Sequence, residues 1–171
     1  MNLRQRVSQL ARRWKQLVKL AVVRVRGDIG ARREVRDTLR MLGLTRVNHC
    51  VLIDDIPTYK GMLQKAKDMI TWGEIHKDTL EALLRKRGKL VGDKRLSDEY
   101  IKSNTQFPSI GEFAEAVHSG KAELSALLGL KKVFRLHPPS KGYEATKRPF
   151  KDMGSLGYRG DKINELLARM T

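Results

Sequence analysis

The first half of the chain alternates apolar segments with amphipathic ones. Three short segments are apolar and rich in β-branched residues, which favours strands: 19–26, 47–53 and 71–75. Between them, residues 31–41 and 59–70 place apolar side chains three and four positions apart, as amphipathic helices do. The order therefore predicts a compact β-α-β-α-β unit of the α+β class, with both helices on one face of a small sheet.

The residues at the ends of these segments refine the prediction. Along the first strand, Arg24 should share one face of the sheet with Arg26, opposite the apolar Val23. Gly43 is expected to end the first helix, and Thr58 to cap the second. A three-stranded unit of this order is a truncated ferredoxin-like fold.

The second half of the chain has a different pattern. It predicts several short helices, one strand and a long Gly- and Pro-rich loop. These are helices at 77–87, 97–103, 110–118 and 122–128, a strand at 133–136, an extended loop at 137–160 and a closing helix at 161–170. Ser97 and Ser109 stand where helix caps are expected. The chain then divides into a basic arm (1–18), a core (19–76), a helical insertion (77–130) and a basic C-terminal segment that returns to the core (131–171).

Positive charge is concentrated at both ends of the chain. The 171 residues contain 35 Lys and Arg against 19 Asp and Glu, a formal net charge of +16. Counted by segment, the balance is +9 over residues 1–60, +1 over 61–130 and +6 over 131–171. An excess of this size predicts a polyanionic partner for the two ends, and a middle that packs, faces solvent or contacts protein.

The sequence also limits compartment and membrane association. A single cysteine, Cys50, allows no intrachain disulfide and indicates a reducing compartment. No run of apolar residues is long enough to span a membrane. Residues 1–18 are basic and amphipathic, with Arg12, Arg13 and Lys15 placed to contact RNA. A targeting or membrane-surface helix is the alternative for this arm.

A Gly-x-x-Gly turn follows the first strand. Gly27 and Gly30 would bring backbone amides and a helix N-terminus together, an arrangement that suits a phosphate group. A simple tight turn explains the same pattern. The turn lacks the Lys-Ser/Thr pair of a nucleotide-binding P-loop, and it is shorter than the dinucleotide-binding fingerprint.

Four arginines follow this turn. Arg32, Arg33, Arg36 and Arg40 recur at helical spacing, so several guanidinium groups should lie along one side of a helix and bind phosphates. The alternative is a solvated face in which Glu34 and Asp37 neutralise the arginines.

Residues suited to catalysis or metal binding do not form a pattern. Asp54 and Asp55 are adjacent at a strand end, where neighbouring side chains point apart. His49 and Cys50 diverge for the same reason, and no metal-ligand spacing such as Cys-x-x-Cys occurs. The residues alone therefore indicate neither a metal site nor a catalytic group.

Gly61 lies in the first turns of the second helix, where glycine costs about 1 kcal/mol relative to alanine. Two explanations stand side by side. A ribose-phosphate backbone could approach the helix there, or the helix could pack very closely on the sheet.

Several short motifs in residues 19–75 occur in one order: Ile29-Gly30, Thr38-Leu39, Leu42-Gly43-Leu44, Asp55-x-Pro57 and Gly61-Met62. Their order and spacing resemble the large-subunit ribosomal protein family called L-thirty in bacteria and archaea and L-seven in eukaryotes. The insertion and the tail resemble the longer archaeal and eukaryotic branch. The long basic N-terminal arm typical of the eukaryotic form is missing, which favours an archaeal source. Residues 1–18 match nothing in the family.

The resemblance implies a structural constituent of the large ribosomal subunit in the cytoplasm. Such a protein would bind folded large-subunit rRNA near the 5S rRNA and contact neighbouring ribosomal proteins, as a monomer without enzymatic activity or cofactor and without membrane contact. On this interpretation, phosphate-binding or RNA-contacting residues are Arg24, Arg26, Gly27, Gly30, Arg32, Arg33, Arg36, Arg40, Arg46, Thr58, Tyr59, Lys60, His137, Lys141, Lys147, Arg148, Phe150 and Arg159. Phe150 and Trp14 could stack on bases or pack within the protein.

Two other functions are compatible with the sequence. One is a free RNA-binding protein or RNA chaperone, which would share the basic ends. The other is an enzyme acting on a nucleotide or RNA, for which Asp54 and Asp55 would be the candidate carboxylates.

Overall fold

A computed structural model describes residues 18–171 of the chain. The arm residues Arg12, Arg13 and Lys15, together with Trp14, lie outside the described residues. The strands are β1 (Lys19–Arg24), β2 (His49–Asp54), β3 (Ile70–Glu74), β4 (Val133–Arg135), β5 (Ala145–Pro149) and β6 (Gly154–Tyr158). The α-helices are α2 (Arg33–Met41), α3 (Pro57–Ala66), α4 (Lys77–Arg87), α5 (Asp98–Asn104), α6 (Ile110–His118) and α7 (Ile163–Met170).

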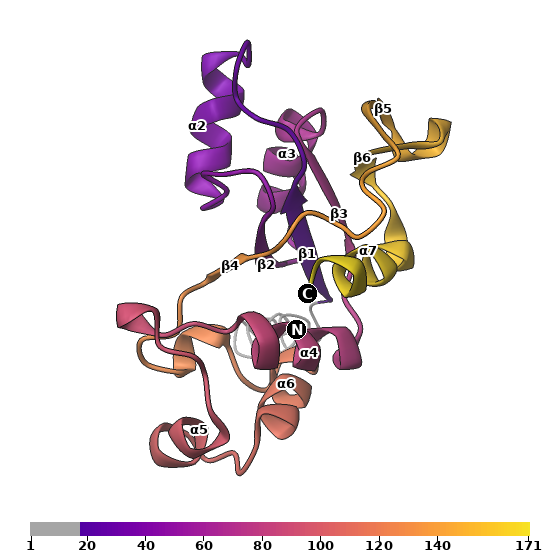
Figure 1. The fold of residues 1–171 in the computed structure, drawn as a ribbon. Coiled ribbons are helices and arrows are strands. Elements are labelled where there is room, and N and C mark those ends of the chain that lie inside the picture. The colour runs from indigo at the N-terminus through magenta and orange to yellow at the C-terminus, as the bar shows by residue number, and fades with distance from the viewer. Residues whose placement is uncertain (1–17) are drawn as a thin grey trace, which may run out of the picture.

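The strands form one mixed sheet in the order β4-β2-β1-β3-β6-β5 (Figure 1). The predicted unit β1-α2-β2-α3-β3 is present, so the α+β class is confirmed. β1 lies between β2 and β3 and is antiparallel to both, with Val22 opposite Val51 on one side and Trp72 on the other. β4 extends the sheet beyond β2, whereas β6 adds to β3 in parallel orientation.

Helices cover both faces of the sheet, because β1 is apolar on both sides. Leu20 and Val22 pack in one core with the apolar sides of α2 and α3. Ala21 and Val23 belong to a second core, built from α4, α5, α6 and α7. The helical insertion is therefore the cover of the second face. The predicted arginine face of the first strand was wrong: Arg24 lies inside, 3% exposed.

The C-terminal segment forms two strands where an extended loop was predicted. β5 and β6 are parallel neighbours, and β6 in turn pairs with β3. A Cβ on Gly154 would lie 2.1 Å from the carbonyl oxygen of Arg148, so only glycine lets the two strands approach this closely. β5 forms the outer edge of the sheet and ends in Pro149, a residue suited to an edge strand.

The helix boundaries test the predicted caps. Ser97 and Ser109 accept hydrogen bonds from the amides of Tyr100 and Glu112, as predicted. Gly43, at φ 79°, follows the last turn of α2 as expected. The prediction for Thr58 was wrong, because Ile56 is the capping position of α3 and Pro57 opens the helix.

The helix predicted over 122–128 was also wrong. It is reduced to a single 3₁₀ turn at Leu124–Ala126. Leu124 packs against the second core and Leu127 is buried in it, whereas Leu128 is 72% exposed. Gly129, at φ 75°, then turns the chain into the bridge between Leu90 and Leu130. Tertiary contacts therefore replace the helix that the local pattern predicted.

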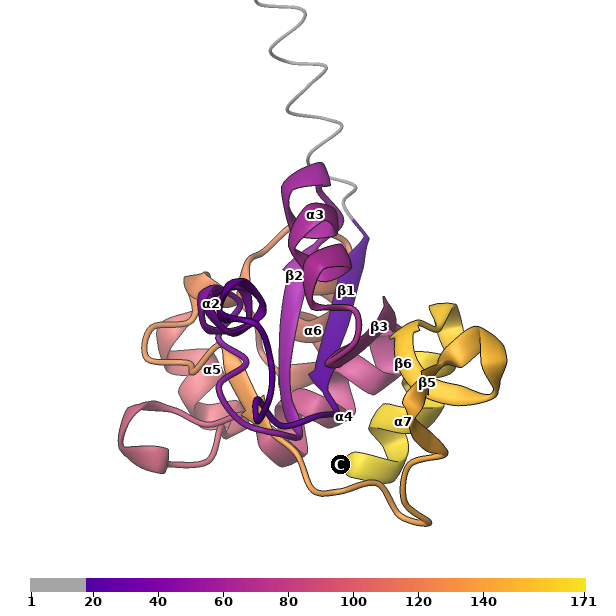
Figure 2. The ribbon, with the colours of Figure 1, turned by 90° about the horizontal axis from the view of Figure 1, so that it is seen from above.

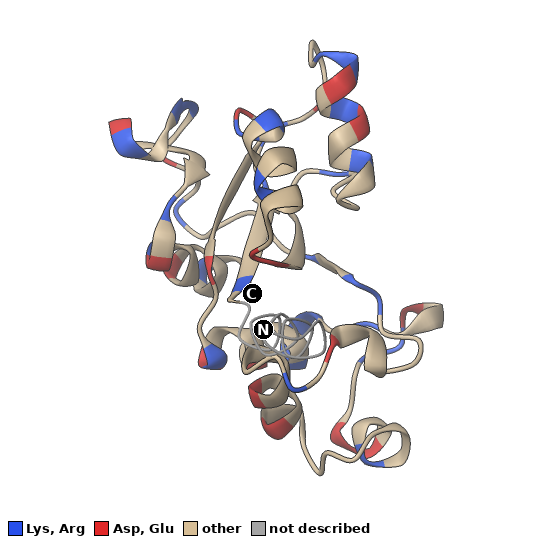
Figure 3. Cartoon of the chain, turned by 180° about the vertical axis from the view of Figure 1, so that it is seen from behind, with Lys and Arg blue, Asp and Glu red and all other residues tan. Residues whose placement is uncertain are grey.

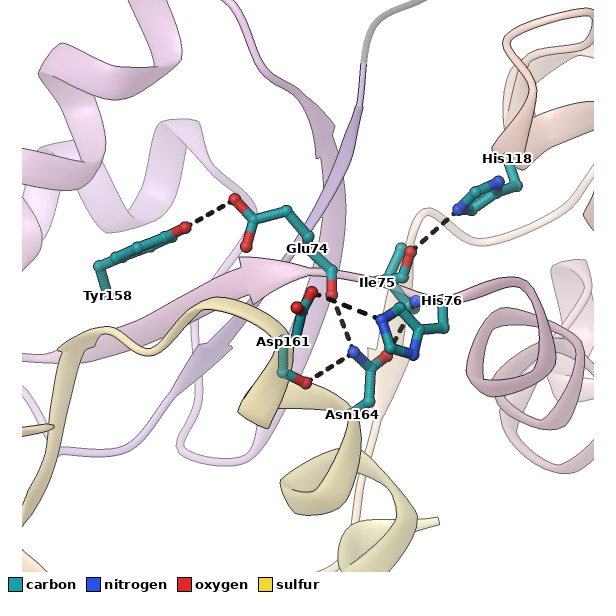
Figure 4. A network of polar contacts seen from close by, with 7 residues as sticks. All are labelled: Glu74, Ile75, His76, His118, Tyr158, Asp161 and Asn164. Carbon is teal, nitrogen blue, oxygen red and sulfur yellow. Dashed lines mark hydrogen bonds and ion pairs between the residues drawn. The ribbon is translucent and has the colours of Figure 1, made fainter.

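Asn164 on α7 fastens the C-terminal helix to the end of β3 (Figure 4). Its Nδ2 donates to the Glu74 carbonyl oxygen at 2.9 Å, and its Oδ1 accepts from the His76 amide at 2.8 Å. His76 Nε2 also lies 3.4 Å from Asp161 Oδ1. These contacts join segments far apart in the sequence and attach α7 to the end of β3.

Candidate nucleic-acid interface

The arginines of α2 lie on the side of the helix that points away from the core. Thr38 and Leu39 are buried in the core, so Arg36 and Arg40 on the helix face solvent, as does Arg32 at the N-cap position just before it. Their spacing of four residues places them along one side. Sequence periodicity thus predicted both faces of this helix correctly.

These guanidinium groups are largely free of intramolecular partners. Arg33 lies 3.7 Å from Asp37, with 90% of its side chain exposed. Within residues 18–171, no carboxylate lies within ion-pair distance of Arg32, Arg36 or Arg40. The alternative of a face neutralised by Glu34 and Asp37 therefore fails for three of the four arginines.

The Gly27–Gly30 turn is open to solvent next to this helix. Gly30 has φ 75° and Ile29 is 99% exposed. The amide of Ala31 donates to the carbonyl of Asp28 at 3.0 Å, which closes the turn before α2 begins at Arg33. The turn itself explains Gly30, and the backbone amides of the turn remain accessible to a ligand.

The start of α3 offers smaller contacts. Thr58 and Lys60 are exposed, whereas Tyr59 is partly buried against the first core. A Cβ added at Gly61 would have no heavy atom within 4 Å. Close packing of the helix on the sheet therefore does not explain this glycine.

The C-terminal segment exposes a second set of cations. Lys147 and Arg148 project from the edge strand β5, and Lys141 lies in the preceding turn at φ 68°. His137 is exposed as well. Phe150 is partly buried, and the Arg159 guanidinium covers one face of its ring at 4.7 Å. In the folded protein the Phe150 ring therefore packs against Arg159 and is not open for stacking on a base.

Two of the predicted phosphate-binding arginines lie inside the protein. Arg24 donates from Nη1 to the Leu44 carbonyl at 2.9 Å and from Nε to the Arg26 carbonyl at 2.8 Å. Arg159 donates from Nε to Thr71 Oγ1 at 3.0 Å. Burial lowers the pKa of both guanidinium groups. Their geometry supports a structural role, so we leave them out of the proposed interface.

The loop from α2 to β2 also carries positive charge. Arg46 is exposed there, while Arg26 is partly buried and donates to the Asp68 carbonyl at 3.2 Å. The pKa of His49 lies below its ordinary value because the ring is desolvated and because Arg135, Arg46 and Arg24 are close by. The three nearby arginines show that positive charge is concentrated around this ring.

The two basic regions point to the same side of the molecule. Figures 1 and 2 show α2 and the β5–β6 unit at opposite flanks of that side, with α3 between them. Figure 3 shows Lys and Arg along α2 and around β5, whereas Asp and Glu outnumber Lys and Arg on α5 and α6. The basic ends and the neutral middle of the sequence thus also occupy different parts of the folded protein.

Groups suited to catalysis remain scattered in the fold. Asp54 pairs with Lys19, and Asp55 pairs with Lys60 at 2.9 Å, so the two carboxylates are separately neutralised. Across residues 18–171, no cluster of three or more His, Cys, Asp or Glu side chains could hold a metal ion. In the same part of the chain, none of the helices has the length and apolarity needed to traverse a bilayer.

Sequence reasoning overlooked one group of residues. Trp72 and Glu74 alternate on one face of β3, and Tyr158 reaches Glu74 with its hydroxyl at 2.8 Å. Tyr158 is 84 positions away in the sequence, so no local spacing could have indicated the group. The alternation of Trp72 with Glu74 was the only available signal.

Comparison with known proteins agrees with the fold and the basic surface. The family model described as ribosomal protein L30p/L7e matches residues 20–70. A protein named large ribosomal subunit protein uL30 from Methanosphaera stadtmanae is 52% identical over 150 residues, which cover 88% of this chain and 98% of the relative. Proteins of the same name from Methanoculleus marisnigri and Methanopyrus kandleri are 51% and 53% identical, with 98% and 99% of their lengths covered.

A basic α+β protein with these relatives is a structural ribosomal protein. The chain belongs to the uL30 family of the large ribosomal subunit, L30p/L7e in its family description. The family is non-enzymatic and its members are proteins of the cytoplasmic ribosome. The matches to archaeal relatives run along nearly their full length, so the prediction of the long archaeal form is confirmed.

Proposed function

We propose that this chain binds folded large-subunit rRNA through two basic surfaces, close to the 5S rRNA. The first, the α2 surface, consists of Arg32, Arg36, Arg40 and Arg46. The second, the C-terminal surface, consists of Lys141, Lys147 and Arg148. The observation that carries the proposal is the row of exposed α2 arginines without ion-pair partners in the described chain. Placement near the 5S rRNA is supported by family membership alone.

Recognition would depend on the RNA backbone and its shape. The deep major groove of A-form RNA hides base edges from side chains, so phosphates and riboses are the accessible groups. Guanidinium groups suit them, because the planar fork donates two hydrogen bonds to one phosphate. The exposed Gly27–Gly30 turn and Gly61 leave room for a ribose-phosphate backbone beside α2 and α3.

The insertion would face other ribosomal proteins. Residues 77–130 contain nine Lys and Arg against eight Asp and Glu, a balance of only +1. Its apolar helices already cover the second face of the sheet, and the rest of its surface lacks the cation excess of α2 and β5. We propose that the chain acts as a monomer within the ribosome, divided into core, insertion and C-terminal segment as the sequence predicts.

The salt dependence of RNA binding tests the α2 surface. The Arg32→Ala and Arg36→Ala double variant should bind large-subunit rRNA more weakly. The slope of log K against log salt concentration should lose about two phosphate contacts. The matched control is Lys86→Ala with Arg95→Ala, which removes two exposed cations from the insertion and should leave the slope unchanged. Equal slopes for all three proteins would remove α2 from the interface.

A free RNA-binding protein would share these basic surfaces but not a stable place in the subunit. Sedimentation separates the two functions. Co-migration with large subunits through a high-salt wash supports the ribosomal role, and release at moderate salt supports the free protein. The same fractions, probed for 5S rRNA crosslinks, test the proposed location.

A further inference from the structure

A pocket of about 290 Å³ lies between α3 and the strands β3 and β6. Its walls contain Leu63 from α3, Trp72 and Glu74 from β3, and Tyr158 from β6. Asp55 and Lys60 complete the rim. Of these residues only Lys60 was predicted to contact RNA, and neither of the two proposed RNA surfaces includes it. The pocket therefore needs an explanation of its own.

The pocket presents two aromatic rings to an incoming group. The ring centroids of Trp72 and Tyr158 lie 6.4 Å apart with an interplanar angle of 50°, so the two rings form an open corner. Tyr158 is 50% exposed and Trp72 is partly buried. The face of such a ring attracts a cation, and tryptophan does so most strongly.

Glu74 adds a carboxylate to the same corner. Tyr158 donates its hydroxyl hydrogen to Glu74 Oε1 at 2.8 Å, which orients the carboxylate (Figure 4). No Lys or Arg of the described chain pairs with Glu74, although the whole sequence contains 35 of them. Asp55, by contrast, is paired with Lys60 at 2.9 Å. The second oxygen of Glu74 thus remains available to a cation from outside.

We propose that this pocket receives the guanidinium group of an arginine from a basic segment of a neighbouring protein. A planar guanidinium can stack on Trp72 or Tyr158 while its fork donates to Glu74, a combination that lysine cannot reproduce. The volume lies just below the roughly 300–1,000 Å³ of small-molecule sites, which suits one side chain. The Glu74 carboxylate, which has no cationic partner in the described chain, opposes a phosphate, so RNA is the less suitable occupant.

Binding of a short peptide to the full chain tests the proposal without rRNA, so its failure leaves the proposed RNA-binding function standing. The chain has two tryptophans, and Trp14→Phe leaves Trp72 as the only indole reporter. Titration with acetyl-Gly-Arg-Gly-amide should shift the Trp72 indole N–H resonance in a saturable way. The matched lysine peptide should bind several-fold more weakly, and the glycine peptide should not bind.

Two substitutions assign the shift to the pocket. Glu74→Gln is nearly isosteric, keeps an acceptor for Tyr158 and should weaken arginine binding about tenfold. Glu112→Gln on the exposed side of α6 removes the same charge elsewhere and should leave binding unchanged. The proposal is overturned by a shift that does not saturate, by equal losses in both variants, or by saturation with guanosine monophosphate but not with the arginine peptide.

Discussion

Arg159 and Thr71 are joined by a hydrogen bond of 3.0 Å between Nε and Oγ1, with both side chains buried. Arg159 follows β6 and Thr71 belongs to β3, so this contact fastens the C-terminal strands to the core sheet. The Arg159 amide also donates to the Trp72 carbonyl at 2.9 Å. A residue that the sequence assigned to RNA therefore holds together the platform on which the RNA surface is built.

Replacing Arg159 should lower stability rather than act directly on RNA contacts. Arg159→Ala removes the donors to Thr71 Oγ1 and the Ser155 carbonyl and uncovers Phe150. Loss of partners for buried polar groups should reduce the free energy of unfolding by about 2 kcal/mol. Urea denaturation followed by circular dichroism measures the change. Arg148→Ala, from the exposed edge strand, should change stability by less than about 0.5 kcal/mol and weaken RNA binding instead.

The substitution Gly61→Ala should change stability and RNA affinity in opposite directions. Because a Cβ there meets no heavy atom within 4 Å, Gly61→Ala should raise the free energy of unfolding by about 1 kcal/mol. The same methyl group should weaken rRNA binding if a ribose-phosphate backbone approaches the helix. Gly73→Ala provides the contrast, since its Cβ would lie 2.0 Å from the Gly160 carbonyl oxygen and should destabilise the fold by about 1–3 kcal/mol. Unaltered RNA affinity in Gly61→Ala would exclude close approach at α3.

Alkaline pH should destabilise the protein through Tyr143. Desolvation by burial raises the pKa of Tyr143 to about 12, and its hydroxyl donates to Asn48 Oδ1 at 2.7 Å. In the unfolded chain the phenol ionises near pH 10. The stabilising contribution is therefore complete below about pH 10 and is lost as the pH rises toward about 12.

Tyr143→Phe isolates this effect. The variant should be less stable than the parent at pH 9, and the difference should shrink as the pH approaches 11. Urea denaturation at each pH measures the gap, and absorbance titration should show the loss of a late-ionising tyrosine. A gap that stays constant with pH would assign the alkaline destabilisation to other groups.

Periodicity predicted the helices and strands of the core, because the apolar residues that pack in the core recur at short, regular intervals along the chain. The helix Arg33–Met41 follows from apolar positions such as Leu39 and Leu42, and from Gly43 at its end. The two serine caps were likewise readable, since a cap depends on residues three positions apart. Where a contact comes from a distant segment, the pattern failed. Gly154 looks like a loop residue until β5 is placed beside it.

In the candidate interface, too, some features could be predicted from the sequence and others could not. Exposure of Arg36 and Arg40 followed from their place on an amphipathic helix, which Arg32 immediately precedes. The burial of Arg24 and Arg159 did not, because their acceptors are the Leu44 carbonyl and the Thr71 hydroxyl, 20 and 88 positions away. A long arginine side chain can meet solvent or an internal carbonyl, and only the fold selects between them.

By itself the sequence determined the α+β core, the concentration of positive charge at the two ends and membership of a ribosomal family, because these depend on composition, short-range periodicity and contiguous motifs. Only the tertiary structure decided which cations remain free, that the insertion covers the second face of the sheet, and that Trp72, Glu74 and Tyr158 meet in one pocket. These outcomes depend on contacts between segments that lie tens of residues apart. Only the folded sheet brings those segments together, so no local sequence pattern could indicate the contacts.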